Sequence, residues 1–464
     1  MMKYEFPENF LWGAAASGPQ TEGITNKQHQ STWEHWFEQE PDRFYNNLSN
    51  FVACDTYNRY KEDAKLMKSI NMNSFRTSIQ WSRLIDDFET ASVNEDAKNF
   101  YRDYFEELIA NGVTPVINLF HFDMPMPLYE QYGGFESKHV SELFAKYAKV
   151  CFELYGDIVK LWTTFNEPIV TVEGGYFDDF HFPNKVDPKL GIQVGYNTQL
   201  AHALAVKEFK ALNTGGEIGI TVNLTPAYPR SNNPADLKAS EIADAILNKS
   251  FVDPSVKGHF PQLLIDLLRE DDMLPEYTKD ELEIISENLV DFIGINYYVP
   301  QRVCAPRHLH NPESPWHYGK YFDGYSMPGS RNNPHRDNNE IYPKAIYDIA
   351  KTVQNEYGNI KWYVAEIGIS ITNEDSLRDE SGMVDDSFRT SLFKEHMVQL
   401  HKAIEEGSNC FGVHQWTFID NWSWINSHKR RYGFFYLDLE TRDRHMKKHA
   451  LYFKQLVEDN GFEM

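Results

Sequence analysis

Cysteine is scarce in this sequence. Its 464 residues include four cysteines, which lie far apart, without a CxxC pair or a histidine at metal-ligand spacing: Cys54, Cys151, Cys304 and Cys410. This pattern is typical of reduced thiols in a cytoplasmic protein. A metal-dependent enzyme would need clustered His and Asp ligands, which the sequence does not offer. We therefore expect a cytoplasmic location and neither a metal ion nor any other cofactor.

Long apolar runs are missing too, and basic residues are few. No segment approaches the ~18 uninterrupted apolar residues of a membrane-spanning helix, and the start, MMKYEFP, does not resemble a signal peptide. Lys and Arg number 45 against 68 Asp and Glu, which leaves a formal charge of −23. This surplus repels nucleic acids and anionic membranes, so neither is expected as a partner. An anionic substrate would need a local basic cluster.

What the sequence does contain is an alternation of short, β-rich apolar runs with helical stretches. The eight runs are residues 10–15, 73–79, 113–120, 161–165, 218–223, 292–297, 362–365 and 410–416. Helical periodicity lies between them, for example in residues 140–154, 198–212 and 386–406.

Strands that alternate with helices imply parallel βαβ units. Eight such units predict an α/β fold, a single (β/α)8 TIM barrel with extended βα loops, over residues 1–464. An open, doubly wound sheet is the structural alternative, but no GxGxxG motif follows the first strand.

The longest irregular stretch runs from residue 301 to about residue 339, between the sixth and seventh runs. Five prolines exclude a continuous helix there: Pro306, Pro312, Pro315, Pro328 and Pro334. In a barrel this loop lies above the carboxyl ends of the strands, so we expect it to form a wall of a substrate cleft.

Polar residues gather where the predicted strands end. Barrel enzymes carry their reactive groups at this end, because the βα loops there surround one cavity. The residues in these positions are Gln20, Glu22, Arg76, His121, Asp123, Asn166, Glu167, Asn296, Tyr298, Glu366 and Trp416. Core packing alone would not select so polar a set, which indicates an active site. His121 has no second His or Cys at zinc spacing, so we expect no metal there.

Two residues of this set, Glu167 and Glu366, suggest a hydrolytic pair. Retaining glycoside hydrolysis needs two carboxyl groups about 5–5.5 Å apart, one to protonate the leaving oxygen and one to attack the anomeric carbon. An ionised nucleophile raises the pKa of its neighbour, which then stays protonated near neutral pH. Arg76 could hold Glu366 ionised. Pro168 disfavours the right-handed helical conformation at Glu167, so we expect an extended backbone there.

Several segments resemble glycoside hydrolase family 1. They are FLWGAAAS (10–17), FRTSIQWSR (75–83), HFDMP (121–125), TFNEP (164–168), NYY (296–298) and the 416–438 region with IDNWSW and RYGFFYLD. The resemblance covers essentially the whole chain and implies that Glu167 is the acid/base and Glu366 the nucleophile. It also implies sugar contacts by Gln20, His121, Asn166, Asn296 and Trp416, and a hydrogen bond from Tyr298 to the nucleophile.

One departure from the family lies beside the nucleophile. The family usually reads Glu-Asn-Gly there, and this chain reads Glu366-Ile367-Gly368. Because Ile367 is not itself the attacking group, we expect activity to survive.

The loop after the eighth run bears on the choice of sugar. Plain glycosidases of the family tend to place Glu before a Trp there, whereas this chain has Ser423 before Trp424. A phosphate at O6 would be repelled by a carboxylate and bound by a hydroxyl. Ser423, Arg430 and Tyr432 resemble the phosphate-binding trio of the 6-phospho-β-glycosidases, which usually has Lys in place of Arg430. A guanidinium can bind phosphate with two N–H bonds; Lys429 is the neighbouring alternative, and residues 429–431 form a local basic cluster.

These features predict an enzyme that hydrolyses β-glycosidic bonds of 6-phosphorylated sugars with retention, through a covalent glycosyl-enzyme intermediate. The substrate would be a 6-phosphorylated disaccharide or aryl β-glycoside, and the enzyme a 6-phospho-β-glucosidase or a 6-phospho-β-galactosidase. The sequence leaves open the sugar configuration, the aglycone and whether the chain forms a homo-oligomer. An unphosphorylated β-glucosidase is the alternative, and a catalytically inactive sugar-binding protein is a remote one because both carboxylates are present.

Overall fold

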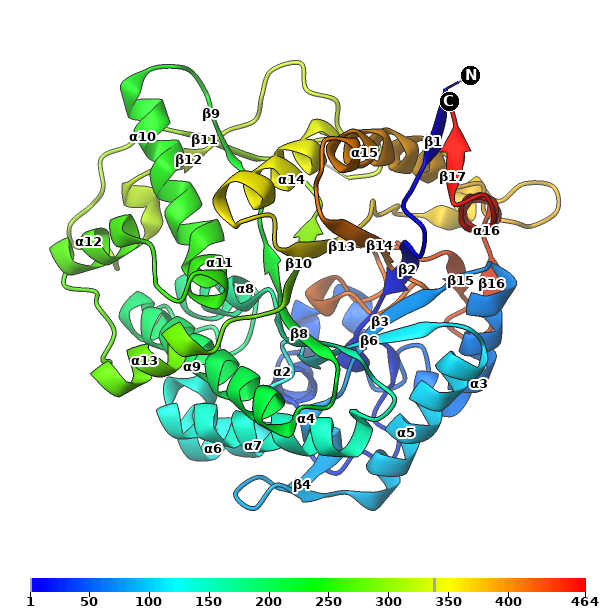
Figure 1. The fold of residues 1–464 in the computed structure, drawn as a ribbon, viewed down its shortest axis with the longest axis horizontal. Coiled ribbons are helices and arrows are strands. Elements are labelled where there is room, and N and C mark those ends of the chain that lie inside the picture. The colour runs from blue at the N-terminus through cyan, green and yellow to red at the C-terminus, as the bar shows by residue number, and fades with distance from the viewer. Residues whose placement is uncertain (1, 337–338) are drawn as a thin grey trace.

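The computed structural model describes residues 2–336 and 339–464, and its centre is a closed barrel of parallel strands (Figure 1). The barrel strands are β2 (Leu11–Ala15), β3 (Ser74–Ser78), β6 (Thr114–Phe120), β7 (Leu161–Asn166), β8 (Glu217–Asn223), β10 (Phe292–Tyr297), β13 (Lys361–Ile367) and β14 (Cys410–Trp416). Each overlaps one of the eight predicted runs, and β14 pairs with β2 to close the ring. The predicted TIM barrel is confirmed. The prediction works because strands buried on both faces read as nearly continuous apolar runs.

Helices surround this barrel (Figure 1). They are α1 (Gly18–Thr21), α2 (Thr32–Gln39), α3 (Thr56–Ser69), α4 (Trp81–Leu84), α5 (Glu95–Ala110), α6 (Met126–Tyr132), α7 (Lys138–Tyr155), α8 (Pro168–Val172), α9 (Pro188–Leu212), α10 (Pro234–Ala243), α11 (Lys249–Val256), α12 (Gln262–Glu270), α13 (Lys279–Glu287), α14 (Lys344–Glu356), α15 (Ser387–Glu405) and α16 (Lys448–Glu458).

Two of these helices show how the sequence sets their limits. In α7 the apolar residues Val140, Leu143, Phe144 and Tyr147 are buried at helical spacing. The Ser137 hydroxyl accepts the His139 N–H at the start of this helix. Helix α9 begins ten residues before the predicted residue 198, at Pro188. The Asp187 side chain accepts the Leu190 N–H, and proline is well suited to the first helical turn, so this start had a local signal.

Within residues 2–336 and 339–464, four small sheets lie outside the barrel. Strand β1 (Lys3–Glu5) pairs with β17 (Gly461–Glu463), so the chain ends lie side by side (Figure 1). Strands β4 (Ile85–Asp87) and β5 (Ser92–Val93) form a second pair, and β15 (Phe435–Leu437) and β16 (Arg444–Met446) a third. The fourth sheet has the order β12 (Asp323–Gly324), β11 (Gln301–Cys304), β9 (Ala227–Pro229). The stretch expected to be irregular from residue 301 thus begins with a strand, which pairs with a segment distant in sequence.

Register shifts interrupt the barrel near the carboxyl ends of its strands. They fall between Ile295 and Asn296 where β10 meets β13, between Val364 and Ile367 where β13 meets β14, and between Thr163 and Asn166 where β7 meets β8. Irregularities of this kind redirect side chains and are common next to active sites. Here one of them brings Asn296 opposite Glu366.

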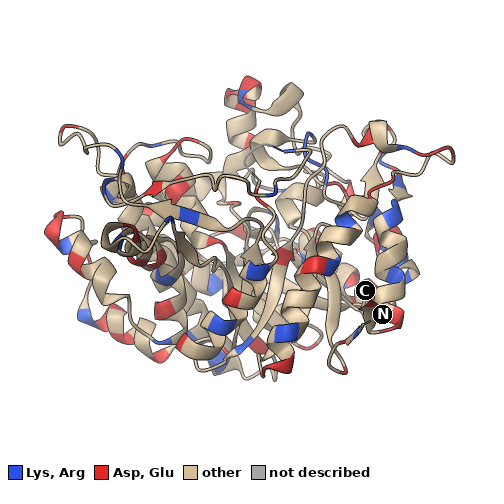
Figure 2. Cartoon of the chain, turned by 90° about the horizontal axis from the view of Figure 1, so that it is seen from above, with Lys and Arg blue, Asp and Glu red and all other residues tan. Residues whose placement is uncertain are grey.

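Charged residues of both signs lie mainly on the outer helices and loops (Figure 2). Within the described part of the chain, no helix combines the length and the apolarity needed to cross a membrane.

Candidate active site

Glu366 lies near the end of β13 and is 4% exposed. Arg76, fully buried on β3, donates through Nη1 to Oε1 of Glu366 (2.5 Å). The Tyr298 hydroxyl donates to Oε2 (2.5 Å). Burial, and then the charge of Glu366, raise the pKa of Tyr298 well above its ordinary value, so Tyr298 remains an O–H donor. Both oxygens of Glu366 are therefore held as hydrogen-bond acceptors in a fixed orientation.

Glu167 follows the last residue of β7 and has a different environment. Its Oε1 accepts hydrogen bonds from Nδ2 of Asn223 (2.9 Å) and Nδ2 of Asn296 (2.8 Å). Burial, followed by the negative charge of Glu366, raises the pKa of Glu167 to about 7. This carboxyl group can therefore hold a proton near neutral pH.

The backbone at Glu167 differs from the expected extended conformation. Its φ of 45° and ψ of 57° are left-handed helical. Pro168 does exclude the right-handed helical region, as expected, but the residue turns the opposite way because it joins β7 directly to α8. In this conformation the Glu167 N–H donates to the Thr221 carbonyl oxygen on the neighbouring strand (2.9 Å). Such a conformation costs about 1–2 kcal/mol in a non-glycine residue and is concentrated at functional sites.

One polar network connects the two carboxyl groups. Nη2 of Arg76 donates to Oδ1 of Asn166 (2.6 Å), and Nδ2 of Asn296 donates to the same oxygen (3.1 Å). Because Arg76 also contacts Glu366 and Asn296 also contacts Glu167, a shift of either carboxyl group would disturb the other. Glu366 has a cationic partner, Arg76, whereas Glu167 has a raised pKa. A retaining glycosidase requires these two different environments for its two carboxyl groups.

A cavity of about 280 Å³ opens beside both glutamates. Its lining includes nine further residues that the sequence singled out for the site: Gln20, His121, Asn166, Tyr298, Trp416, Ser423, Trp424, Arg430 and Tyr432. Two more predicted residues, Arg76 and Asn296, contact the glutamates through hydrogen bonds instead of lining the cavity.

The imidazole of His121 forms part of an aromatic wall of this cavity. Its ring is stacked 5.9 Å from Trp416 and 6.0 Å from Trp424, measured between centroids. Burial, and then the charge of Arg76, hold the pKa of His121 well below its ordinary value, so the ring is neutral. Nε2 of this neutral imidazole lies 3.3 Å from Nδ2 of Asn166, and the flat ring adds apolar surface that suits the C–H groups of a sugar.

The predicted basic cluster at residues 429–431 is divided by the structure. Arg430 lines the cavity together with Ser423 and Tyr432. Lys429 is exposed, does not line the cavity, and places its Nζ 5.2 Å from the centre of the Tyr45 ring. Arg431 is buried, and its Nη1 donates to the Leu437 carbonyl oxygen (3.2 Å). Of these three cations, Arg430 is the one at the cavity.

Two strand-end residues of the predicted polar set have structural partners instead. Glu22 is buried and accepts from Nε of Arg83 (2.8 Å) and Nε2 of Gln80 (2.6 Å). Asp123 is buried and accepts the His121 N–H (3.0 Å). Neither is among the residues that line the cavity.

Asn223 and Arg336 are polar residues of the site that were not among those predicted. Asn223, which contacts Glu167, is the last residue of β8, so the strand-end rule used for the other residues would have found it. Arg336 lines the cavity from the long loop after β10. The course of that loop has no signature in the sequence, so no local signal marks Arg336.

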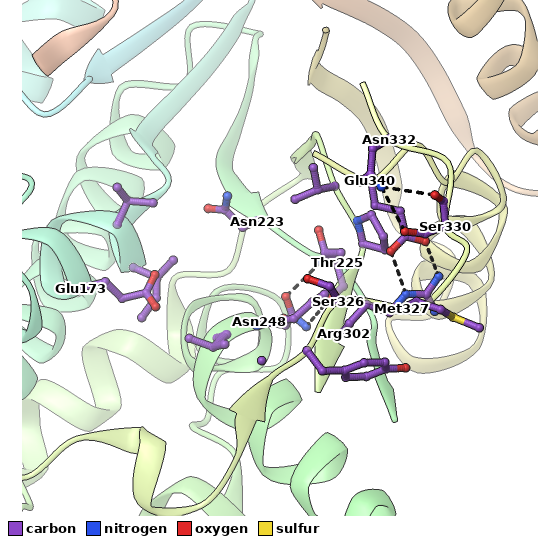
Figure 3. A pocket seen from close by; sticks show the side chains of 18 of the residues that line it. Glu173, Asn223, Thr225, Asn248, Arg302, Ser326, Met327, Ser330, Asn332 and Glu340 are labelled. Atoms are coloured by element: carbon purple, nitrogen blue, oxygen red, sulfur yellow. Dashed lines mark hydrogen bonds and ion pairs between the residues drawn. The ribbon is translucent and has the colours of Figure 1, made fainter. Parts of the chain in front are cut away.

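A second cavity has a volume of about 840 Å³ and is drawn in Figure 3. Asn223 belongs to its wall and also donates to Glu167. Figure 3 shows Glu173 and Asn223 on one side and Arg302 and Glu340 on the other. The predicted wall-forming loop does line it, through residues 301, 302, 307, 324–327, 330 and 332. Polar side chains of this cavity therefore lie next to a hydrogen-bond donor of Glu167.

The sequence profile described as Glycosyl hydrolase family 1 matches residues 2–462. The chain belongs to glycosyl hydrolase family 1. Family members similar to it include 6-phospho-beta-glucosidase GmuD of Bacillus subtilis (strain 168), 48% identical over 463 residues and 99% of each chain. Beta-glucosidase A of Acetivibrio thermocellus is 31% identical over 100% of each chain. Among solved structures, the family 1 β-glucosidase from Thermotoga maritima superimposes with a TM-score of 0.91 at 32% identity, over 100% of both chains.

Proposed function

We propose that this glycosyl hydrolase family 1 enzyme is a 6-phospho-β-glucosidase that acts with retention of configuration. One observation carries the proposal: Ser423, Arg430 and Tyr432 line the same cavity as Glu167 and Glu366. Two hydroxyls and a guanidinium suit the phosphate of a 6-phosphorylated sugar. The 48% identity to an enzyme named 6-phospho-beta-glucosidase supports both the phosphate and the gluco configuration.

In the proposed mechanism Glu366 attacks the anomeric carbon while Glu167 donates its proton to the leaving oxygen. A covalent glycosyl-enzyme forms and the aglycone departs. Glu167, now ionised, takes a proton from a water molecule that attacks the anomeric carbon, and Glu366 leaves as a carboxylate. Arg76 and Tyr298 orient Glu366 through their hydrogen bonds, and Asn223 and Asn296 orient Glu167.

The sugar ring would lie between these carboxyl groups and the aromatic wall. We propose that Gln20, His121 and Asn166 bind its hydroxyls and that Trp416 and Trp424 cover its apolar face. Gln20 is held for this role: its amide oxygen accepts from Ser17 (2.7 Å), and one of its N–H groups donates to the Trp422 carbonyl oxygen (2.8 Å). Its second N–H remains for a substrate hydroxyl.

The larger cavity suits a polar aglycone. Glu173, Asn223, Asn248, Arg302 and Glu340 offer donors and acceptors on opposite sides of it, as Figure 3 shows. We therefore propose a 6-phosphorylated disaccharide as substrate, with the second sugar in this cavity.

We further propose that residues 1–464 act as one domain in the cytoplasm. The pairing of β1 with β17 joins the two ends of the chain, which supports a single unit. The four cysteines are buried and unpaired, in keeping with a reducing compartment.

The test of the proposed function is a comparison of kcat/KM for four nitrophenyl β-glycosides: the glucoside, the galactoside and the 6-phosphate of each. We expect the glucoside 6-phosphate to be the best substrate. Arg430→Ala and Ser423→Ala should raise KM for it, whereas the matched control Lys429→Ala removes a neighbouring cation that does not line the cavity. A preference for the plain glucoside would make the enzyme a β-glucosidase with an altered O6 pocket and would refute the proposal.

A further inference from the structure

A second arginine lines the cavity in which the substrate phosphate is proposed to bind. Arg336 comes from the loop between β10 and α14 and lines the same cavity as Ser423, Arg430 and Tyr432. Its Nη1 lies 3.5 Å from the Tyr432 hydroxyl oxygen, a long contact that leaves the guanidinium able to bind elsewhere.

The two arginines have no carboxylate partner in the described part of the chain. The other loop arginines differ: Arg302 pairs with Glu340 (2.7 Å) and Arg331 pairs with Glu395 (2.8 Å). Burial, and then the positive charge of Arg336, lower the pKa of Arg430, so the two cations are close enough to repel each other. Two like charges in a partly buried site are unfavourable unless an anion binds between them.

The turn that carries Arg336 is fastened to the barrel. Nδ2 of Asn333, which is buried, donates to the Ser370 carbonyl oxygen (3.0 Å), and its Oδ1 accepts the His335 N–H (2.9 Å). The Thr372 hydroxyl donates to the His335 carbonyl oxygen (3.2 Å). Ser370 and Thr372 follow β13, the strand that carries Glu366. Hydrogen bonds therefore link the turn of Arg336 to the segment after this strand.

We infer that Arg336 determines specificity by binding the substrate phosphate together with Arg430. A phosphate monoester carries a charge of about −1.5 to −2 at neutral pH and three terminal oxygens. Two guanidiniums and the hydroxyls of Ser423 and Tyr432 supply enough donors for all three oxygens. The inference rests on the proposed function and adds to the predicted trio a residue contributed by a different loop.

The test uses Arg336→Gln, which removes the charge and keeps most of the side chain. The measured quantity is kcat/KM for nitrophenyl β-glucoside 6-phosphate divided by kcat/KM for the plain glucoside. Charge-assisted hydrogen bonds predict that this ratio falls by about 10- to 100-fold, mainly through KM of the phosphorylated substrate. The inhibition constant of glucose 6-phosphate should rise in parallel, and Arg336→Lys should restore part of the ratio.

The matched control is Arg331→Gln, in the same loop but exposed and paired with Glu395. This variant should leave the ratio within about twofold of wild type, because an exposed ion pair contributes little interaction energy. If both arginines bind one phosphate, the fold-decrease of the ratio in the double variant Arg336→Gln/Arg430→Gln should be smaller than the product of the decreases in the two single variants.

The inference is overturned if Arg336→Gln lowers kcat/KM equally for the phosphorylated and the plain glucoside, so that the ratio of the two stays unchanged. Failure of the proposed function has a different signature: the wild-type enzyme would itself prefer the plain glucoside, and glucose 6-phosphate would not inhibit it. Melting temperatures of the variants, and their turnover of the plain glucoside, separate loss of binding from loss of folding.

Discussion

Replacing Glu366 by Gln should lower the pKa of Glu167. Two causes raise this pKa from its ordinary value of 4.5 to about 7, burial first and the charge of Glu366 second. The whole difference corresponds to about 3 kcal/mol in favour of the neutral carboxyl group. Because the charge of Glu366 is the second of the two raising causes, removing it should lower the pKa of Glu167 by about 1, which corresponds to about 1.4 kcal/mol.

The assay is a ¹³C NMR titration with side-chain-labelled glutamate. The resonance of Glu167 is assigned by its loss in Glu167→Gln, because burial also raises the pKa of Glu173 to about 7. Glu173→Gln is the matched control and should leave the titration of Glu167 unchanged, since Glu173 is not among the groups that shift it. A Glu167 pKa that stays the same or rises in Glu366→Gln would refute the reasoning.

The same pKa sets the sign of the pH dependence of catalysis. Glu167 must be protonated to act as an acid, so kcat/KM for a substrate with a poor leaving group should fall as pH rises through about 7. A rate that rises through this range would exclude Glu167 as the proton donor.

Three further predictions concern other parts of the account. Glu366→Ala should abolish turnover, and azide should partly restore it by attacking in place of the carboxylate. NMR of the product checks this rescue. Loss of turnover without rescue by azide would argue against Glu366 as the nucleophile. Glu167→Gln should lower the rate of hydrolysis of substrates with poor leaving groups by about 10²–10⁴-fold, and that of activated aryl glycosides much less. An equal decrease for both kinds of substrate would show that Glu167 is not the acid. Lys447→Met should lower the free energy of unfolding by about 3–5 kcal/mol, because buried Lys447 pairs with both Glu374 (2.6 Å) and Asp420 (2.7 Å). Urea unfolding measures this loss, and the neighbouring variant Lys448→Met, which breaks only half-exposed pairs, should cost less than about 1 kcal/mol.

The barrel could be predicted from the sequence because its physical cause is local. Parallel strands covered on both sides need apolar residues throughout, and this requirement is visible within short windows such as residues 113–120. The pairing of β11 with β9 escaped prediction because it joins segments more than seventy residues apart. The left-handed backbone at Glu167 also escaped it: Pro168 excludes one conformation but does not choose between the remaining ones.

The candidate site could be predicted only as far as it depends on strand ends. Glu167, Glu366 and Asn223 all follow from the rule that polar residues at the carboxyl ends of strands share one cavity, although Asn223 was overlooked. The loops obey no such rule. Lys429 and Arg430 are adjacent in sequence, yet only Arg430 lines the cavity, and Arg336 reaches it from a loop whose course depends on tertiary contacts.

The most direct test of the central claim is mass spectrometry of the enzyme after reaction with a 2-deoxy-2-fluoro-β-glucosyl 6-phosphate that bears an activated leaving group. Fluorine at C2 slows hydrolysis of the intermediate more than its formation, so a retaining enzyme retains the label. The account predicts one label per chain, attached to the peptide that contains Glu366, formed much faster than with the unphosphorylated probe. A label on another residue, or faster labelling by the unphosphorylated probe, would contradict it.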